Sequence, residues 1–177
     1  MFNLAEFQNM VTYVENFNMH YSLLLQRYER FTEINEISNR DIDVITFLDI
    51  IVVQLRALCI ESPRLNHNYT AQNLLRIMQR DDLAEKIDNM LSEEFLPGAI
   101  DFDIRKALKL LADKFICHYD SIDKEELALA GIIEAQLKNP YTDHNLAYIM
   151  NTVMECIGKG LSIDNFKKVI GSASGVS

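Results

Sequence analysis

The chain has 177 residues, of which 49% are hydrophobic, and its 26 acidic and 17 basic residues give a net charge of -9. This length is enough for one domain with a core of its own, and the acidic balance argues against a broad basic groove for nucleic acid, because phosphate contacts need local lysine and arginine. The 6 glycines and 3 prolines are too few for a many-stranded sheet and indicate long helices.

The sequence shows no targeting or membrane segment. Residues 1–20 lack the basic start and apolar block of a secretory signal, and the most apolar stretch, residues 47–60, is too short and too polar to span a bilayer. The cysteines are odd in number and widely spaced in apolar contexts: Cys59, Cys117 and Cys156. This pattern predicts reduced, buried thiols in a cytoplasmic protein.

The first forty residues predict one long helix and then a break. Apolar residues recur at helical spacing through residues 3–31, and the helix is expected to bend near Asn18. The polar string that follows offers Ser38 or Asn39 as a cap for the next helix.

The second helix is expected from about residue 41 to residue 60. Its apolar face is wide, which predicts a central helix packed against more than one neighbour. Arg56 emerges from this apolar surface, where a charge needs a carboxylate partner or a path to water. We expect an ion pair with Asp49 or with an acid on a facing helix.

Two short helices are expected next. Thr70 is placed to cap the first, and Asp81 or Asp82 the second. Residues 80–96 carry six acids and two bases, which predicts a solvated face that is a poor surface for RNA.

Residues 101–120, DFDIRKALKLLADKFICHYD, are the candidate site. Their apolar stripe, which predicts a core helix, contains Ile104, Ala107, Leu108, Leu111 and Phe115. The polar residues are densest at the C-terminal end, where Lys114 and His118 are four residues apart and so share a helix face.

Two longer helices and a short one complete the predicted fold. Asp123 is expected to cap the first, which ends before Pro140, and Asp143 the second. The inward residues expected on the first are Leu127, Ala130, Ile133 and Leu137, and the stops expected for the second are Gly158 and Gly160. A short helix over about residues 164–170 precedes a tail, residues 171–177, that is expected to be disordered. The whole predicts an all-α bundle of five or six principal helices in one domain, residues 1–170.

No metal or cofactor site is expected from the motifs. The four histidines never lie three or four residues apart, and neither an HExxH nor a CxxC motif is present. Cys117 and His118 are adjacent, and adjacent residues point about 100° apart on a helix, so they cannot pair as nucleophile and base.

The string ADKFICHYD, at the end of a long helix in an all-helical domain, resembles the terminal motif of the HEPN superfamily (higher eukaryotes and prokaryotes nucleotide binding). Lys114, His118 and Asp120 match the typical pattern RNKxxAHxD. The upstream passage, in which NYTAQNLL follows a helix with an arginine near its end, resembles the abortive-infection branch. The likeness covers roughly residues 45–120.

This resemblance implies an up-and-down helical bundle that forms a homodimer through the motif helix. In active members the motif belongs to a metal-independent RNase, in which histidine gives general acid-base help and arginine holds the scissile phosphate. This chain departs from the pattern: four, five and six residues separate His118 from Asp113, Ala112 and Leu111, and none of these is arginine.

The missing arginine changes what the motif can do. Asp113 would repel a phosphate, and Lys114 supplies a point charge without the bidentate geometry of a guanidinium. Arg105 would stand about 140° from His118 round an ideal helix, which leaves Arg56 or Arg64 as a replacement.

Two interpretations are possible for each of the motif residues His118 and Tyr119. His118 is either a helix-end histidine, favoured by the helix dipole and bonded to Asp120 or a carbonyl, or a residue that faces a nucleotide. Tyr119 is either a packed aromatic or a ligand for the nucleotide.

Three functional hypotheses follow. The first is a non-catalytic HEPN-like module of a bacterial defence or toxin-antitoxin system, which acts as a dimer and binds a nucleotide, RNA or a cognate toxin or antitoxin. The second is a working RNase that uses His118 with an arginine from another helix or subunit. The third is an unrelated helical scaffold whose ending imitates the motif.

Overall fold

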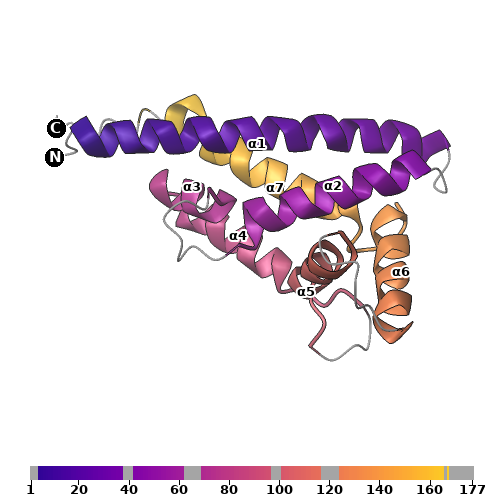
Figure 1. Cartoon of the computed structure of the whole chain (residues 1–177). Coiled ribbons are helices and arrows are strands. Elements are labelled where there is room, and N and C mark those ends of the chain that lie inside the picture. Colours follow the sequence, from indigo (N-terminus) through magenta and orange to yellow (C-terminus); the bar gives the residue numbers. More distant parts are fainter. Residues whose placement is uncertain are drawn as a thin grey trace.

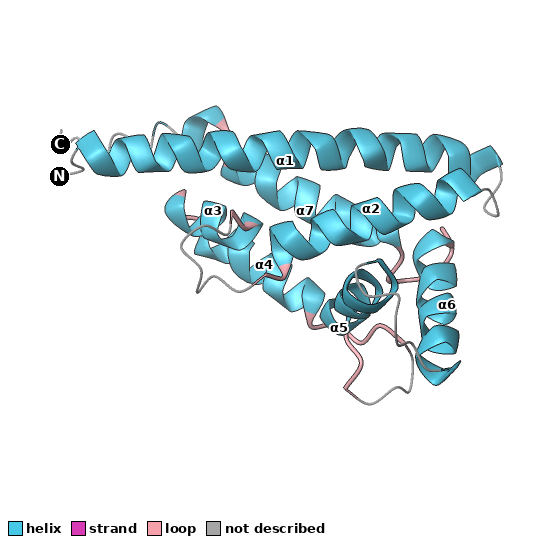
Figure 2. Ribbon diagram, viewed as in Figure 1, coloured by secondary structure: helices cyan, strands magenta, loops and turns pink. Residues whose placement is uncertain are grey.

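A computed structural model describes residues 4–37, 42–61, 69–96, 101–116, 124–165 and 167 of the chain. Within these ranges the protein is all-helical, with no strand beyond an isolated bridge between Glu94 and Asp103, so the predicted all-α class is confirmed (Figures 1 and 2). The helices are α1 (Leu4–Ile37), α2 (Ile42–Cys59), α3 (Ala71–Ile77), α4 (Asp81–Leu91), α5 (Ile104–Leu110), the π-helix η1 (Leu111–Ile116), α6 (Lys124–Lys138) and α7 (Leu146–Gly160). Residues 163–165 and 167 are also helical, where the last short helix is predicted.

Helix α1 is long because it carries a heptad seam. The buried side chains of α1 recur every seven residues: Met10, Phe17, Leu24 and Phe31. This spacing keeps one narrow stripe in contact with a partner helix, and α2 lies alongside α1 (Figure 1). The prediction that the helix ends at Phe31 is wrong, because Ile34 still packs on the core and Asn35 donates to the carbonyl oxygen of Lys138. The helix also continues through Asn18 without interruption.

Helix α2 is the central helix that its wide apolar face predicts. Its buried residues are Val44, Leu48, Ile51, Val52, Leu55, Leu58 and Cys59. It contacts α1 on one side and α3, α5 and η1 on others. Each buried leucine or isoleucine of such a helix contributes about 1.5–3 kcal/mol relative to an exposed one, so α2 makes a large contribution to core burial.

Helix caps follow the sequence prediction at one of three described positions. The Thr70 side chain accepts a hydrogen bond from the Asn73 amide and caps α3, as predicted. The prediction of Asp81 or Asp82 as the cap of α4 is wrong, because Arg80 occupies that position without a side-chain cap bond. Both acids lie in the first turn instead, where their charge is favourable to the helix dipole.

The helix predicted for residues 101–120 begins later than expected, because the connection from α4 extends to Asp103. Asp101 has a φ of 64°, a left-handed conformation that aspartate tolerates but that a helix excludes. The Phe95 amide donates to the Phe102 carbonyl at 2.9 Å. Asp103 then caps α5 by accepting from the Lys106 amide at 2.7 Å. The helix therefore begins at Ile104, and Ile104, Ala107, Leu108 and Leu111 of the predicted stripe are buried.

Helix α6 lies at the edge of the molecule and runs across the direction of α1 (Figure 1). Ala130, Ile133 and Leu137 are buried as predicted, but the prediction for Leu127 is wrong, because this side chain is 52% exposed. The described contacts of α6 include α7 and η1, and Asn35 of α1 bonds to its last residue, Lys138. Leu127 is not buried in these contacts. The predicted cap Asp123 is outside the described residues.

Helix α7 differs from the prediction in its N-cap and at Gly158. Asn145, rather than Asp143, caps it by accepting from the Tyr148 amide at 2.9 Å. Gly158 is not a stop, because the helix continues past it, whereas Gly160 is the last helical residue, as predicted, and Leu161 is the C-cap. Gly160 also serves packing, because a Cβ there would clash with the Leu75 Cδ2 atom. The missing side chain lets α7 approach α3 closely.

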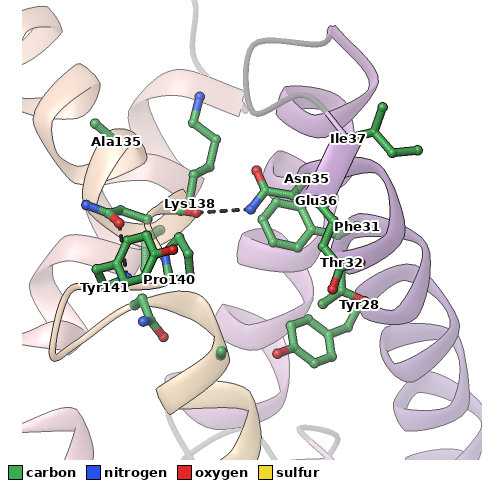
Figure 3. Close-up of a pocket in the computed structure, with 14 residues that line it drawn as sticks. Tyr28, Phe31, Thr32, Asn35, Glu36, Ile37, Ala135, Lys138, Pro140 and Tyr141 are labelled. Carbon is green, nitrogen blue, oxygen red and sulfur yellow. Dashed lines mark hydrogen bonds between the residues drawn. The ribbon is translucent and has the colours of Figure 1, made fainter.

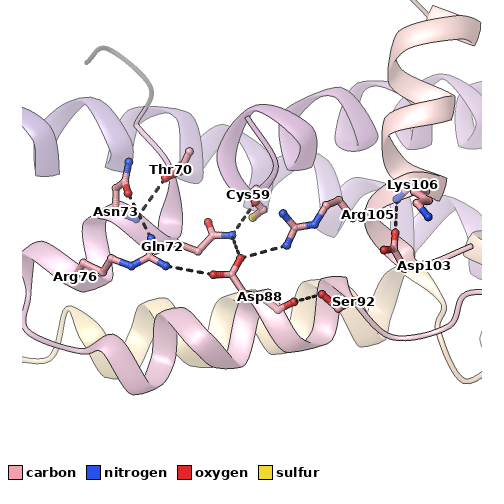
Figure 4. Close-up of polar contacts among 10 residues, drawn as sticks. All are labelled: Cys59, Thr70, Gln72, Asn73, Arg76, Asp88, Ser92, Asp103, Arg105 and Lys106. Carbon is pink, nitrogen blue, oxygen red and sulfur yellow. Dashed lines mark hydrogen bonds and ion pairs between the residues drawn. The ribbon is translucent and has the colours of Figure 1, made fainter. Parts of the chain in front are cut away.

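Asp88 joins three helices through polar contacts (Figure 4). Its carboxylate accepts from Gln72 at 3.1 Å and from Arg76 at 3.2 Å, both on α3, and from Arg105 on α5 at 3.3 Å. Gln72 also donates to the Cys59 carbonyl at the end of α2 at 2.7 Å. The Asp88 cluster, formed by these four side chains, therefore ties α4 to the elements on both of its sides.

Replacement of Asp88 by alanine should lower the free energy of unfolding by about 1–2 kcal/mol, because three partly exposed charge-assisted contacts are lost together. Urea denaturation measures this loss. The control is Asp82→Ala, which breaks a pair with Arg80 that stays within one exposed turn. An equal effect of the two substitutions would show that the Asp88 cluster does not link the helices.

Asp49 is a half-buried acid between α2 and α6. Burial, and next the charge of Glu134, raise the pKa of Asp49 to about 6, while Lys138 lowers it. A raised pKa in the folded state means that Asp49 favours folding below pH about 4 and opposes it as the pH rises through about 6.

Asp49→Asn should therefore stabilise the protein at pH 8 by on the order of 1 kcal/mol, after allowance for solvent screening, and have little effect at pH 4. Chemical denaturation of both proteins across this pH range gives the comparison. A wild type and variant that keep a constant difference at every pH would refute the role of Asp49 ionisation.

Candidate functional site

The structure describes only part of the predicted site. His118, Tyr119, Asp120 and Arg64 lie outside the described residues. Lys114 belongs to η1, but its side chain is also outside them. Asp113 and Arg56 are described in full, and they are the two predicted site residues that the structure brings together.

The helix that carries the motif changes type where the motif begins. Residues 104–110 are α-helical, whereas Leu111–Ile116 form a π-helix, in which hydrogen bonds run between residues five apart. The turn is wider than in an α-helix, so the ideal-helix angle of about 140° between Arg105 and His118 does not apply. π-helices are rare overall, but many of those that occur lie at functional sites. This end of the helix therefore remains the candidate site.

Arg56 reaches the motif helix from α2. Its Nη2 atom lies 2.8 Å from Asp113 Oδ1, and its Nη1 atom lies 3.6 Å from Glu61 Oε1. The predicted ion pair with an acid on a facing helix is thus confirmed, and Asp113 is that acid. The alternative partner, Asp49, is wrong for a geometric reason: seven residues along one helix separate the two side chains by about 10 Å.

The pair has limited exposure. The Arg56 and Asp113 side chains are each 30% exposed, so their attraction is stronger than that of a surface pair but is still screened by water. Because two carboxylates balance one guanidinium, the local charge at this point is negative. This arrangement fixes α2 against η1 and offers no free cation to a phosphate.

Arg105 is also engaged elsewhere. It lies on α5 and donates to Asp88, so it belongs to the Asp88 cluster (Figure 4). Within the described part of the chain, the arginines of α2 and α5 both have carboxylate partners. Neither Arg56 nor Arg105 could therefore bind a phosphate without leaving an existing pair.

One group of polar residues is missed by the sequence reasoning. The Tyr148 hydroxyl donates to Glu93, with oxygen distances of 2.9 and 2.7 Å, and His144 Nε2 lies 3.2 Å from the same carboxylate. Burial and the Glu93 charge raise the pKa of Tyr148 to about 12, so this phenol stays protonated and is neither base nor nucleophile. The group fastens the start of α7 to the end of α4. Glu93 and Tyr148 are separated by 55 positions in the sequence, so no local pattern could reveal their contact.

The described residues contain no group of three or more histidine, cysteine, aspartate or glutamate side chains placed to hold a metal ion. No helix among them has the length and apolar character that a membrane crossing requires. Comparison of the chain with protein-family models, curated proteins and solved structures gives no match.

A double-mutant cycle on Arg56→Ala and Asp113→Ala should give a coupling energy of about 0.5–1.5 kcal/mol, because the pair is partly buried and spans two helices. The cycle is measured by urea denaturation of the wild type, the single variants and the double variant. Arg30 and Glu33, which pair at 2.8 Å on the exposed face of α1, provide the control cycle, with coupling within about 0.5 kcal/mol of zero. Equal coupling in the two cycles would contradict the structural role of Arg56.

Proposed function

We propose that this chain is a HEPN-like helical module without RNase activity, which acts as a homodimer and as a binding or regulatory subunit in a bacterial defence or toxin-antitoxin system. The observation that carries the proposal is the contact between Arg56 and two carboxylates, Asp113 and Glu61. The all-helical architecture and the HEPN-like ending at His118 support the family part of the proposal. The partner is a cognate toxin or antitoxin, or a nucleotide or RNA bound without cleavage.

Electrostatics at Arg56 supports the lack of RNase activity. A phosphate that approached Arg56 would meet Asp113, which already occupies the guanidinium at 2.8 Å. Two like charges about 4 Å apart repel by about 1 kcal/mol in water and about 4 kcal/mol near a protein surface. That penalty opposes the binding energy that the arginine would have to supply.

The alternative is a metal-independent RNase that uses His118 with Arg56. One observation favours it: Arg56 contacts the motif helix itself, five residues before His118. In that case RNA or a partner subunit would have to draw Asp113 away from Arg56, and Asp113→Asn should increase the activity.

Purified wild type and His118→Ala should both leave labelled RNA intact in the presence of EDTA. Asp113→Asn, included as the variant most favourable to the enzyme, should also be inactive. Denaturing gel electrophoresis of the RNA gives the result.

Cleavage by the wild type that is lost in His118→Ala would contradict the proposal and establish the RNase. Light scattering on the same samples should give the mass of a dimer. A monomeric mass at all concentrations would remove the homodimer from the proposal while leaving the RNase result intact.

A further inference from the structure

A cleft of about 1020 Å³ opens between the C-terminal end of α1 and the connection from α6 to α7 (Figure 3). Aromatic side chains Tyr28 and Phe31 line the α1 bank, and Pro140 and Tyr141 line the other. The Asn35 side chain donates to the Lys138 carbonyl at 3.0 Å and thereby joins the two banks. None of the lining residues comes from the motif helix, so the cleft is a separate feature from the site of the proposed function.

Two large apolar side chains that line the cleft are exposed to solvent. Ile37 is 86% exposed and Tyr141 is 92% exposed. Ile42, at the start of α2 and so at the same end of the α1-α2 pair, is 71% exposed. Single apolar residues on a surface are ordinary, but a group around a cleft marks an interaction site. A small molecule inside the cleft would leave these side chains in water, so the expected ligand is a macromolecule.

The charges around the cleft are unbalanced. Glu36 lines the cleft, and Asp143 lies in the connection two residues beyond the lining residue Tyr141. Both acids are exposed, and no described residue forms an ion pair with either. Lys138, which lines the cleft, is already bound to Glu134 at 2.6 Å. The cleft therefore attracts a basic partner. A second copy of this chain, with its net charge of -9, is repelled on average.

The floor of the cleft holds an unused acceptor. The Asn35 Oδ1 atom is buried and has no donor among the described residues. A buried acceptor without a partner destabilises the folded protein, because it has lost its bond to water. A donor on a bound segment that reached Oδ1 would offset part of this loss while the Nδ2 bond to Lys138 stays in place.

From these observations we infer that the cleft receives a short segment of another protein, with a large apolar anchor flanked by lysine or arginine. The anchor packs between the partly buried Tyr28 on the α1 bank and the exposed Tyr141 on the other, and the exposed Ile37 borders this site. The basic side chains pair with Glu36 and Asp143 on opposite banks. This mode joins an aromatic-lined pocket for affinity with rim charges that set specificity and association rate.

A phage library of random short peptides, panned on the full-length protein, is the first test. Enriched peptides should combine an aromatic or large aliphatic residue with neighbouring lysine or arginine. The affinity of a synthetic copy is then measured by fluorescence anisotropy. It should fall at least about tenfold for Ile37→Ser with Tyr141→Ser, because the anchor contacts are lost.

The charge variant Glu36→Gln with Asp143→Asn should weaken binding by about threefold to tenfold and reduce its dependence on salt. Matched controls lie away from the cleft: Ile163→Ser removes another exposed apolar side chain, and Glu85→Gln another acid. Both should bind the peptide like the wild type.

Failure to enrich any peptide, enrichment of acidic peptides, or equal affinity for wild type and the Ile37→Ser/Tyr141→Ser variant would each overturn the proposal. Sedimentation that shows self-association of the wild type, lost in that variant, would identify a second copy as the occupant and would also overturn it. Circular dichroism confirms that the variants are folded. This is expected because the altered side chains are exposed.

Discussion

The burial of α2 is the constraint on which the rest of the structure depends. Helix α2 has 18 residues and carries apolar side chains around most of its circumference, so other elements must pack on several of its sides. These elements are α1, α3, α5 and η1. Asp49 and Arg56 are seven residues apart, so they lie within about 20° of each other on an ideal helix and form one polar edge. The neighbours that meet this edge must bring the opposite charges.

That polar edge selects which segments pack where. Toward its N-terminal end Asp49 faces Glu134 and Lys138 of α6, and toward its C-terminal end Arg56 pairs with Asp113 of η1. Partly buried charges add little net stability, because desolvation offsets much of the attraction, but a misplaced neighbour would leave them unpaired at a larger cost. The edge therefore favours one arrangement of α6 and η1 around a mainly apolar helix.

Periodicity and residue chemistry predicted much of this fold. The wide apolar face of α2, the cap at Thr70 and the need of Arg56 for a facing acid could all be inferred because each follows from a local property of the chain. Two other caps were placed wrongly: Arg80 and Asn145 occupy positions for which several nearby polar residues were equally suitable, and loop backbone geometry decides among them.

Other features could not be read from the sequence. The change from α- to π-helix at Leu111 has no local marker in the apolar pattern, although it widens the turn and shifts the hydrogen bonds. The contacts of Glu93 with Tyr148 and the cleft beside Ile37 join segments more than 50 and more than 90 residues apart. The predicted site residues from His118 to Asp120 lie outside the described residues, and their roles stay predictions.

The distribution of charge bears on which kind of partner the protein can bind. Arg56, Arg76 and Arg105 each contact a carboxylate of the protein itself, so their positive charge is balanced internally. Exposed acids such as Glu36 and Asp143 are not balanced by any described residue. A phosphate at any of these three arginines would have to break an existing pair, whereas a basic protein segment would meet these two carboxylates without breaking an ion pair of the described residues. The same 26 acids and 17 bases thus oppose the RNase hypothesis and favour a basic protein partner.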